Sequence, residues 1–243
     1  MYLKNSLKLA LLLSSVAGLA NANDYGLKFQ PYLGVDIQSA KWGFEDTYGK
    51  GHIPKSAKQG HVYFGVQVHD YLALELGYEA SQKKTNTMSL AVGGANVVGA
   101  VVTADQADSN NHFSISQQAV NFDLVPQIKI PGHEEITVFG VVGVSIENIN
   151  AGLSLTTLPD GTGADTRKSQ ISQKNKNILR LGAGAKYQFS DNAGVKVSAV
   201  WKKWGGYNNM TGAAEVYHGR SFDALTARMR NGYQFGLGVY AAI

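Results

Sequence analysis

The stretch Tyr71–Ala80 (YLALELGYEA) alternates between two kinds of residue. One set is made of leucines, a tyrosine and an alanine, whereas the other is made of alanine, glycine and two glutamates. A period of two places these sets on opposite faces of a β-strand. Glycine offers water no side chain and weakens a solvated strand, so this small, charged face suits a narrow barrel interior. We therefore expect a barrel with apolar residues outside, against lipid, and small or charged residues inside.

The same alternation recurs along the chain and predicts eight strands, at 28–38, 61–70, 71–80, 116–130, 136–147, 178–189, 194–202 and 231–243. Short connections follow the second, fourth and sixth strands. Long stretches follow the first, third, fifth and seventh strands and are predicted to be loops, at 39–60, 81–111, 148–176 and 203–224. Alternating short and long connections are typical of an all-β, antiparallel, up-and-down transmembrane β-barrel, with short turns in the periplasm and long loops outside.

The composition favours strands over membrane helices. The chain has 243 residues with 28 glycines and 5 prolines, and its mean hydropathy is −0.14. It contains no run of about 20 apolar residues, which a membrane helix requires. A transmembrane barrel needs no such run, because only alternate residues face lipid. Cysteine is absent, which excludes disulfides, thiol catalysis and Cys-ligated metals.

The N-terminus has the features of a secretory signal peptide. Two lysines precede the short apolar run Leu9–Val16, and Ala20 and Ala22 form an A-x-A cleavage site. This order of basic, apolar and small residues is typical of a secretory signal that is removed before folding. We expect residues 1–22 to be cleaved and residues 23–243 to form the barrel, with no periplasmic domain.

Three segments carry a resemblance to a known family. They are PYLGVDI (Pro31–Ile37), LELGYE (Leu74–Glu79) and FGLGVYAAI (Phe235–Ile243). The chain resembles the eight-stranded outer-membrane barrels typified by the membrane domain of OmpA, together with OmpX-like surface proteins. The resemblance implies a location in the cell outer membrane of a Gram-negative bacterium and assembly by the barrel assembly machinery. It also implies a non-enzymatic role in membrane integrity and in surface interaction through long loops, as an antigen or adhesin.

The resemblance further implies ion pairs inside the barrel. Glu75 matches the central interior glutamate of the family, and Lys196 matches the arginine on the seventh strand that pairs with it. Lys186, Val141 and Asp36 fall where the family has a glutamate, an arginine and a lysine, so the network is rewired. Whether Glu75 pairs with Lys196 or with Lys186 stays open at this point.

The alternation by itself also turns several charged residues inward: Asp36, Glu75, Glu79, Asp123, Arg180, Lys186 and Lys196. An unpaired ion in a narrow lumen costs several kcal/mol, so these residues are expected to pair. The pairs are candidates either for packing or for a gate that exchanges partners and briefly opens a water path. A narrow, gated, porin-like channel is therefore the alternative function.

Enzymatic chemistry has only a weak signal in the sequence. His112 and Ser114 form an H-x-S arrangement, which some barrel enzymes that deacylate lipid A also use. No third member is evident, and Ile115 stands where those enzymes have asparagine. A lipid A-modifying enzyme is thus a distant alternative, and no catalytic residue is assigned. The spacing of residues suggests no metal site, cofactor or nucleic-acid partner.

Basic residues gather near the predicted loops: Lys50, Lys55, Lys58, Lys83, Lys84, Arg167, Lys168, Lys174, Lys202 and Lys203. They form either a solvated rim or a surface that contacts lipopolysaccharide phosphates. Outward aromatic residues fit girdles at the two membrane interfaces: Phe29, Tyr78, Tyr187, Phe189, Trp201 and Phe235. The expected partners are outer-membrane lipid, lipopolysaccharide and extracellular ligands of the loops.

Overall fold

The computed structural model describes residues 28–46, 54–88, 111–157, 165–203, 210–211, 215–217, 220–222, 226–229 and 231–243. The regular elements in these ranges are β-strands. Among the described residues there is no helix of the length and apolarity that crossing a membrane requires. The predicted signal peptide with Ala20 and Ala22, as well as Lys50, lies outside the described residues.

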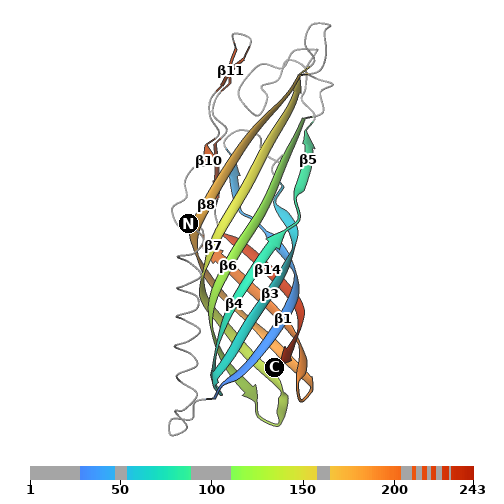
Figure 1. Cartoon of the computed structure of the whole chain (residues 1–243), viewed down its shortest axis with the longest axis vertical. Helices are drawn as coiled ribbons and strands as arrows, with labels where there is room; N and C mark the ends of the chain where they lie inside the picture. Colours follow the sequence, from blue (N-terminus) through green and yellow to red (C-terminus); the bar gives the residue numbers. More distant parts are fainter. Residues whose placement is uncertain are drawn as a thin grey trace.

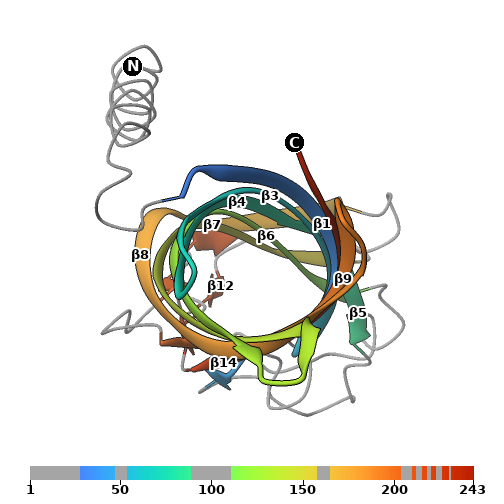
Figure 2. The ribbon, with the colours of Figure 1, turned by 90° about the horizontal axis from the view of Figure 1, so that it is seen from below.

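Eight antiparallel strands form a closed barrel (Figures 1 and 2). They are β1 (Gln30–Lys41), β3 (Ser56–His69), β4 (Leu72–Ser81), β6 (Asn111–Ile130), β7 (His133–Thr157), β8 (Asp165–Ser190), β9 (Ala193–Lys203) and β14 (Gly232–Ala242). Each strand pairs with its sequence neighbours in the ring, and β14 returns to pair with β1. The predicted eight-stranded up-and-down barrel is confirmed, and ring closure pairs the backbone groups that an open edge would leave bare in lipid.

One end of the barrel carries the short connections (bottom of Figure 1). The turns are Asp70–Tyr71 between β3 and β4, Pro131–Gly132 between β6 and β7, and Asp191–Asn192 between β8 and β9. Gly132 has φ of +80°, which glycine adopts without steric cost. The beginning of β1 and the end of β14 lie at this same end, which we call the short-turn end.

The outer wall of the barrel is an apolar belt, as the alternation predicted. Its side chains are exposed on the surface of the protein, and Ile37 is 74% exposed. The belt includes Leu33, Val35, Val62, Leu124, Val142, Val144, Leu181, Val197, Leu237 and Val239. It ends sharply toward the other end of the barrel, where the next outward residues are Ser39 on β1, Gln118 on β6 and Lys203 on β9. So large an exposed apolar surface requires lipid around it.

The glycines of the inner face make room for large side chains on neighbouring strands. Tyr32 on β1 faces Gly65 on β3, and Tyr63 on β3 faces Gly34 on β1. A Cβ atom added at Gly65 would collide with the Tyr32 ring, and one at Gly34 would collide with the Tyr63 ring. At these two positions the small inner residue is therefore a packing requirement, since a ring fills the space that the glycine leaves.

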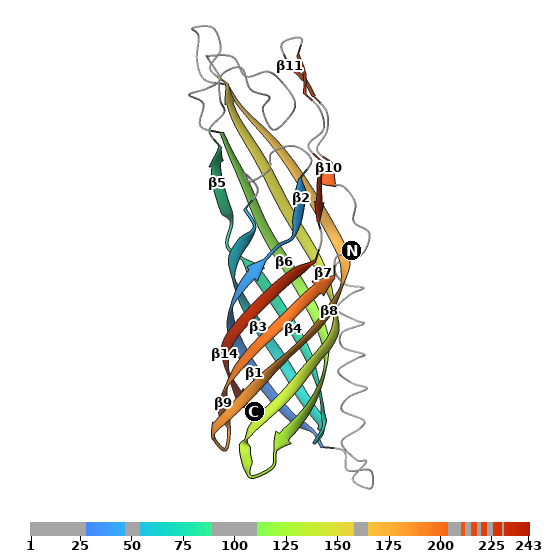
Figure 3. The ribbon, with the colours of Figure 1, turned by 180° about the vertical axis from the view of Figure 1, so that it is seen from behind.

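The strands run beyond the predicted boundaries at the end opposite the short turns (Figure 3). β7 and β8 reach 25 and 26 residues, and they pair as far out as Thr157 and Asp165. Further short strands occupy the predicted loops: β2 (Phe44–Asp46), β5 (Lys84–Met88), β10 (Met210–Thr211), β11 (Glu215–Tyr217) and β12 (Arg220–Phe222). β13 (Thr226–Met229) lies between the last predicted loop and the last predicted strand. The prediction of loops over these stretches was thus wrong in part. The outer part of β8 is almost entirely polar, so no period marks it as a strand. On β7 the alternation continues through Ile149, Ala151, Leu153 and Leu155, and the loop prediction overlooked this signal.

A bulge separates the barrel part of the β7–β8 pair from its outer part. The register between these strands shifts between Glu147 and Ile149. Asn175 on β8 has φ of 56°, and its backbone N–H donates to Oδ1 of Asn148 at 2.8 Å. Asparagine tolerates this left-handed conformation better than most residues. We call the paired residues outside the bulge, Ile149–Thr157 and Asp165–Gln173, the outer hairpin.

Candidate functional site

The lumen contains two clusters of buried charged side chains. The first, nearer the short-turn end, is centred on Glu75 of β4. Lys196 of β9 donates to both of its carboxylate oxygens, at 3.0 and 2.8 Å. Lys186 of β8 lies 3.8 Å from Oε1, and the Tyr32 hydroxyl donates to the same oxygen at 2.8 Å. Glu75 therefore contacts both of its candidate partners, and Lys196 is the closer one.

Aromatic rings surround the two lysines of this cluster. The Lys196 ammonium lies 4.0 Å from the centre of the Tyr63 ring. The Lys186 ammonium lies 4.7 Å from the centre of the Tyr32 ring and also approaches Phe139 and Tyr240. Ring faces attract cations, and more strongly where water is excluded. The lysines are direct cross-strand neighbours, so the cluster holds two positive charges against one carboxylate.

The second cluster lies farther from the short-turn end and holds more carboxylates than cations. Arg180 of β8 donates through Nε to Asp123 at 3.0 Å, and its Nη1 reaches Glu79 at 3.4 Å. Lys202 of β9 pairs with Glu79 and, at 2.6 Å, with Glu147 of β7. Three carboxylates thus face two cations, and all five side chains are almost fully buried. The first cluster therefore has one positive charge in excess, and the second has one negative charge in excess.

Amide side chains complete the hydrogen bonding of the second cluster. Gln117 donates to Glu147 at 2.6 Å and accepts from the Trp42 indole at 2.6 Å. Asn121 donates to Glu79 at 3.1 Å, while Gln234 donates to Gln59 at 2.6 Å. These residues come from several strands around the ring, so hydrogen bonds tie the wall together across the lumen. Buried charges stay stable only when their remaining lone pairs and protons are satisfied in this way.

Asp36 is separate from both clusters. Its Oδ2 lies 2.9 Å from Nδ1 of His61 on the neighbouring strand β3. Its Oδ1 and the Nε2 atom of His61 have no hydrogen-bond partner among the described residues. The His61 ring stacks on Tyr63, with ring centres 5.2 Å apart.

The structure brings most of the residues singled out from the sequence into contact. Glu75, Lys186 and Lys196 form one group, and Asp123 and Arg180 belong to another, whereas Asp36 meets none of them. Sequence reasoning missed His61 and Glu147 as lumen residues, although the period of two reaches them from Tyr63 and Ser145.

Lys202 was assigned to the basic rim, and this was wrong. Its side chain is 2% exposed and lies in the lumen. It is six positions from the inward Lys196 on the same strand, and an even separation places two strand residues on one face. The error arose because Lys202 lies beside Lys203, which does point outward and is exposed.

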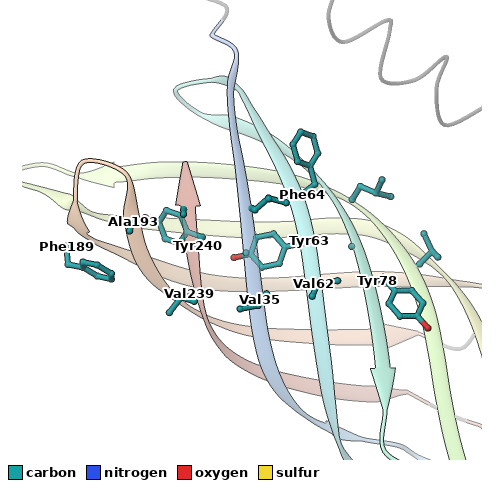
Figure 4. Close-up of a pocket in the computed structure, with 15 residues that line it drawn as sticks. Val35, Val62, Tyr63, Phe64, Tyr78, Phe189, Ala193, Val239 and Tyr240 are labelled. Carbon is teal, nitrogen blue, oxygen red and sulfur yellow. The ribbon is translucent and has the colours of Figure 1, made fainter. Parts of the chain in front are cut away.

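The outer wall has a shallow groove of about 900 Å³ over β1, β3, β4 and the β8–β9 turn (Figure 4). Val35, Val62, Tyr78, Phe189 and Val239 are among the residues that line it. The groove is almost entirely apolar and lies within the belt. Apart from three tyrosines its lining residues are apolar, and acyl chains of lipid suit it.

The H-x-S pair of the sequence lies on β6, outside the belt. The Ser114 hydroxyl donates to the carbonyl oxygen of Gly152 on β7, at 3.4 Å. The His112 side chain lies outside the described residues. Ser114 thus has a structural partner, and no described contact activates it as a nucleophile.

Comparison with known proteins identifies the family. The family model described as "Outer membrane protein beta-barrel domain" matches residues 9–200. The chain is similar in structure to the outer membrane protein OprG from Pseudomonas aeruginosa, with 9% identity, a TM-score of 0.55, and coverage of 90% of this chain and 98% of that one. A major outer membrane protein from Thermus thermophilus gives 13% identity, a TM-score of 0.50, and coverage of 87% and 99%. At these identities the likeness shows the fold alone. A search of curated proteins found no significant match.

Proposed function

Since the chain belongs to the family of outer-membrane β-barrel proteins and is located in the cell outer membrane, we propose that it is a non-enzymatic barrel that supports membrane integrity and interacts with surface partners. The short-turn end faces the periplasm and the outer hairpin faces the exterior, which is the usual orientation of such barrels. Lipid surrounds the apolar belt.

The observation that carries this proposal is the contrast between a filled lumen and an extended exterior. The lumen is crossed by ion pairs and amide hydrogen bonds from several strands. By contrast, β7 and β8 continue as a paired hairpin well beyond the belt. A barrel wall of this kind holds a surface structure rigidly in the membrane, and rigid scaffolds commonly carry binding loops.

Charge suggests the kind of partner. The segment Asp165–Asn177 contains Arg167, Lys168, Lys174 and Lys176 against one acid, Asp165. The facing segment of β7, Asn148–Thr157, has no charged residue. Basic groups near the membrane surface attract phosphate and carboxylate groups. We propose that the outer hairpin contacts anionic groups, with lipopolysaccharide phosphates as the nearest source and extracellular ligands as further ones. Assembly by the barrel assembly machinery is part of the same proposal.

The proposal can be tested by shortening the outer hairpin. Asn150 and Ser172 are register partners, so joining them through a two-residue Asn-Gly turn preserves the pairing below. Bacteria that display the wild-type or the shortened barrel are assayed for adhesion to cultured epithelial cells and to immobilised lipopolysaccharide. We expect adhesion in the wild type and its loss in the shortened form.

The double variant Arg167→Gln, Lys168→Gln keeps the outer hairpin and removes its two basic side chains. It should lose adhesion to lipopolysaccharide to a similar degree, and more so at low salt, where exposed charges are least screened. Equal display of folded protein is checked by surface labelling. Adhesion that does not change in either variant would contradict the proposal.

A narrow gated channel is the second candidate, and one observation favours it. Lys186 and Lys196 compete for the single carboxylate of Glu75, at 3.8 and 2.8 Å. An exchange of partners could open a water path along the lumen. If it does, conductance in a planar bilayer should change in a Glu75→Ala variant. If neither the wild type nor the variant conducts ions, the channel function is excluded.

A further inference from the structure

The short-turn end opens into a cavity of about 460 Å³ inside the barrel mouth. Lys28, Asp70, Lys129 and Asp191 line its rim, and Tyr32 and Lys186 line its inner part. Both lysines of the rim have acidic partners, whereas Asp191 is in no ion pair among the described residues. Lys28 pairs with Asp70 at 2.6 Å, and Lys129 lies 3.8 Å from Glu134.

Lys186 is the group in this cavity whose contacts fall short of its needs. It is 7% exposed, so bulk water reaches it little. Its contact with Glu75 is 3.8 Å long, and its hydrogen bond to the Tyr32 hydroxyl is 3.5 Å, at the outer limit for such a bond. An ammonium group has three N–H donors, and among the described residues Lys186 meets only these two distant oxygens and the faces of aromatic rings.

The net charge of the cluster around Glu75 also leaves Lys186 without a full countercharge. Lys196 already contacts both oxygens of Glu75, so Lys186 is the surplus cation of the group. A buried charge without full compensation destabilises the fold, and an anion beside it removes that penalty. Gln127 and Gln188 also line the cavity and carry amide N–H groups. One N–H of Gln188 already donates to the backbone oxygen of Asp191 at 3.0 Å, which leaves its second N–H for a ligand.

We propose that this cavity is a binding site for a small oxyanion, a phosphate or a carboxylate, which enters from the periplasm and pairs with Lys186. The aromatic rings of Tyr32 and Tyr240 form its inner wall, and the amides of Gln127 and Gln188 provide further donors. The site is separate from the outer hairpin, so it stands or falls independently of the surface function.

The test is a chemical-shift titration of the backbone amides by solution NMR, on the full barrel in uncharged maltoside micelles. Inorganic phosphate and acetate are added in separate arms, and sodium chloride at equal ionic strength is the reference. Free phosphate in phospholipid-free micelles separates a soluble anion from a lipid headgroup. We expect saturable shifts around Tyr32, Lys186 and Gln188, with at least one of the two oxyanions.

Variants that change the local charge give the proposal its sharpest test. Lys186→Gln should weaken binding about tenfold or more, the scale of one lost charge-assisted hydrogen bond. Lys196→Gln should also weaken binding, although Lys196 does not line the cavity. Glu75 would then pair with Lys186 alone, and Lys186 would no longer lack a countercharge. Glu75→Gln should tighten binding, because both lysines lose their carboxylate.

The matched control is Lys203→Gln, which removes an exposed lysine at the other end of the same strand as Lys196. It should leave the affinity unchanged. Folding of each variant is verified by its amide spectrum before titration. Shifts that sodium chloride reproduces, or an affinity that is the same in Lys186→Gln as in the wild type, would overturn the proposal.

Discussion

Glu75 is the carboxylate on which two lysines depend, so its removal should cost more than the loss of an ordinary ion pair. Glu75→Gln leaves two buried ammonium groups without a countercharge. Breaking a buried pair from one side costs about 3–5 kcal/mol. We expect the free energy of unfolding, measured by urea titration in lipid vesicles, to fall by that amount.

The matched control for this substitution is Glu134→Gln, which breaks an exposed pair with Lys129. Exposed pairs contribute about 0–1 kcal/mol, so the change should be small. A Glu75 variant as stable as the Glu134 variant would show that the lumen cluster is not a stabilising ion pair.

Asp70 gives a prediction about pH at the short-turn end. The hydrogen bond from Lys28, at 2.6 Å, lowers the pKa of Asp70 below its ordinary value of 3.8. A carboxyl whose pKa is depressed by folding stabilises the fold above its unfolded pKa. That contribution disappears as pH falls through the folded pKa. In a carboxyl-detected NMR titration the Asp70 midpoint should lie below 3.8 in the wild type and rise in Lys28→Gln. Identical midpoints in the two proteins would contradict the assignment.

At the scale of strands, the glycines of the inner face determine which substitutions a strand accepts. Gly65→Val would drive its side chain into the Tyr32 ring and displace the hydroxyl that donates to Glu75. Overpacking of this kind typically costs about 1–3 kcal/mol, and loss of the hydrogen bond adds to it. We expect a clearly lower unfolding free energy, measured in the same vesicle assay.

Gly60→Val, on the same strand β3, is the control. A Cβ atom there meets nothing within 4 Å, and valine favours strands. It should be neutral or slightly stabilising. If both substitutions cost the same, the effect belongs to the strand backbone and not to the space beside Tyr32.

The strands also show what could and could not be predicted from the sequence. Inside the belt, lipid on one side and a polar lumen on the other impose a strict period of two, so the faces of β1, β4 and β14 were predicted correctly. Outside the belt β8 is almost entirely polar and carries no such signal, whereas β7 keeps an alternation through Ile149, Ala151, Leu153 and Leu155 that the loop prediction overlooked. Contacts between side chains on different strands depend on the register of the strands. His61 meets Asp36 through the register of β1 and β3, which the spacing within either strand does not contain.

For the whole molecule, the two charge clusters balance one another. The cluster around Glu75 has one cation in excess, and the cluster around Glu79 has one carboxylate in excess. A substitution that increases the charge excess of one cluster should therefore destabilise the barrel more than substitutions that remove the excess from both clusters. Lys202→Met should be severely destabilising in the urea titration in vesicles. Among the ion pairs of the described residues, Glu147 would lose its partner and Glu79 would keep Arg180 alone.

The central claim is that the outward apolar belt marks the depth of the membrane. The chain has no cysteine, so single cysteines can be introduced and labelled with a fluorophore without background. Ile37→Cys, Val142→Cys and Leu181→Cys place the label in the belt, whereas Lys58→Cys, Gln118→Cys and Lys203→Cys place it on outward residues beyond the belt.

The decisive measurement is quenching of these labels by brominated lipids after reconstitution into vesicles. Strong quenching of the three belt positions and weak quenching of the three others is the expected result. Equal quenching at both sets, or none at either, would contradict a barrel that spans the membrane through this belt.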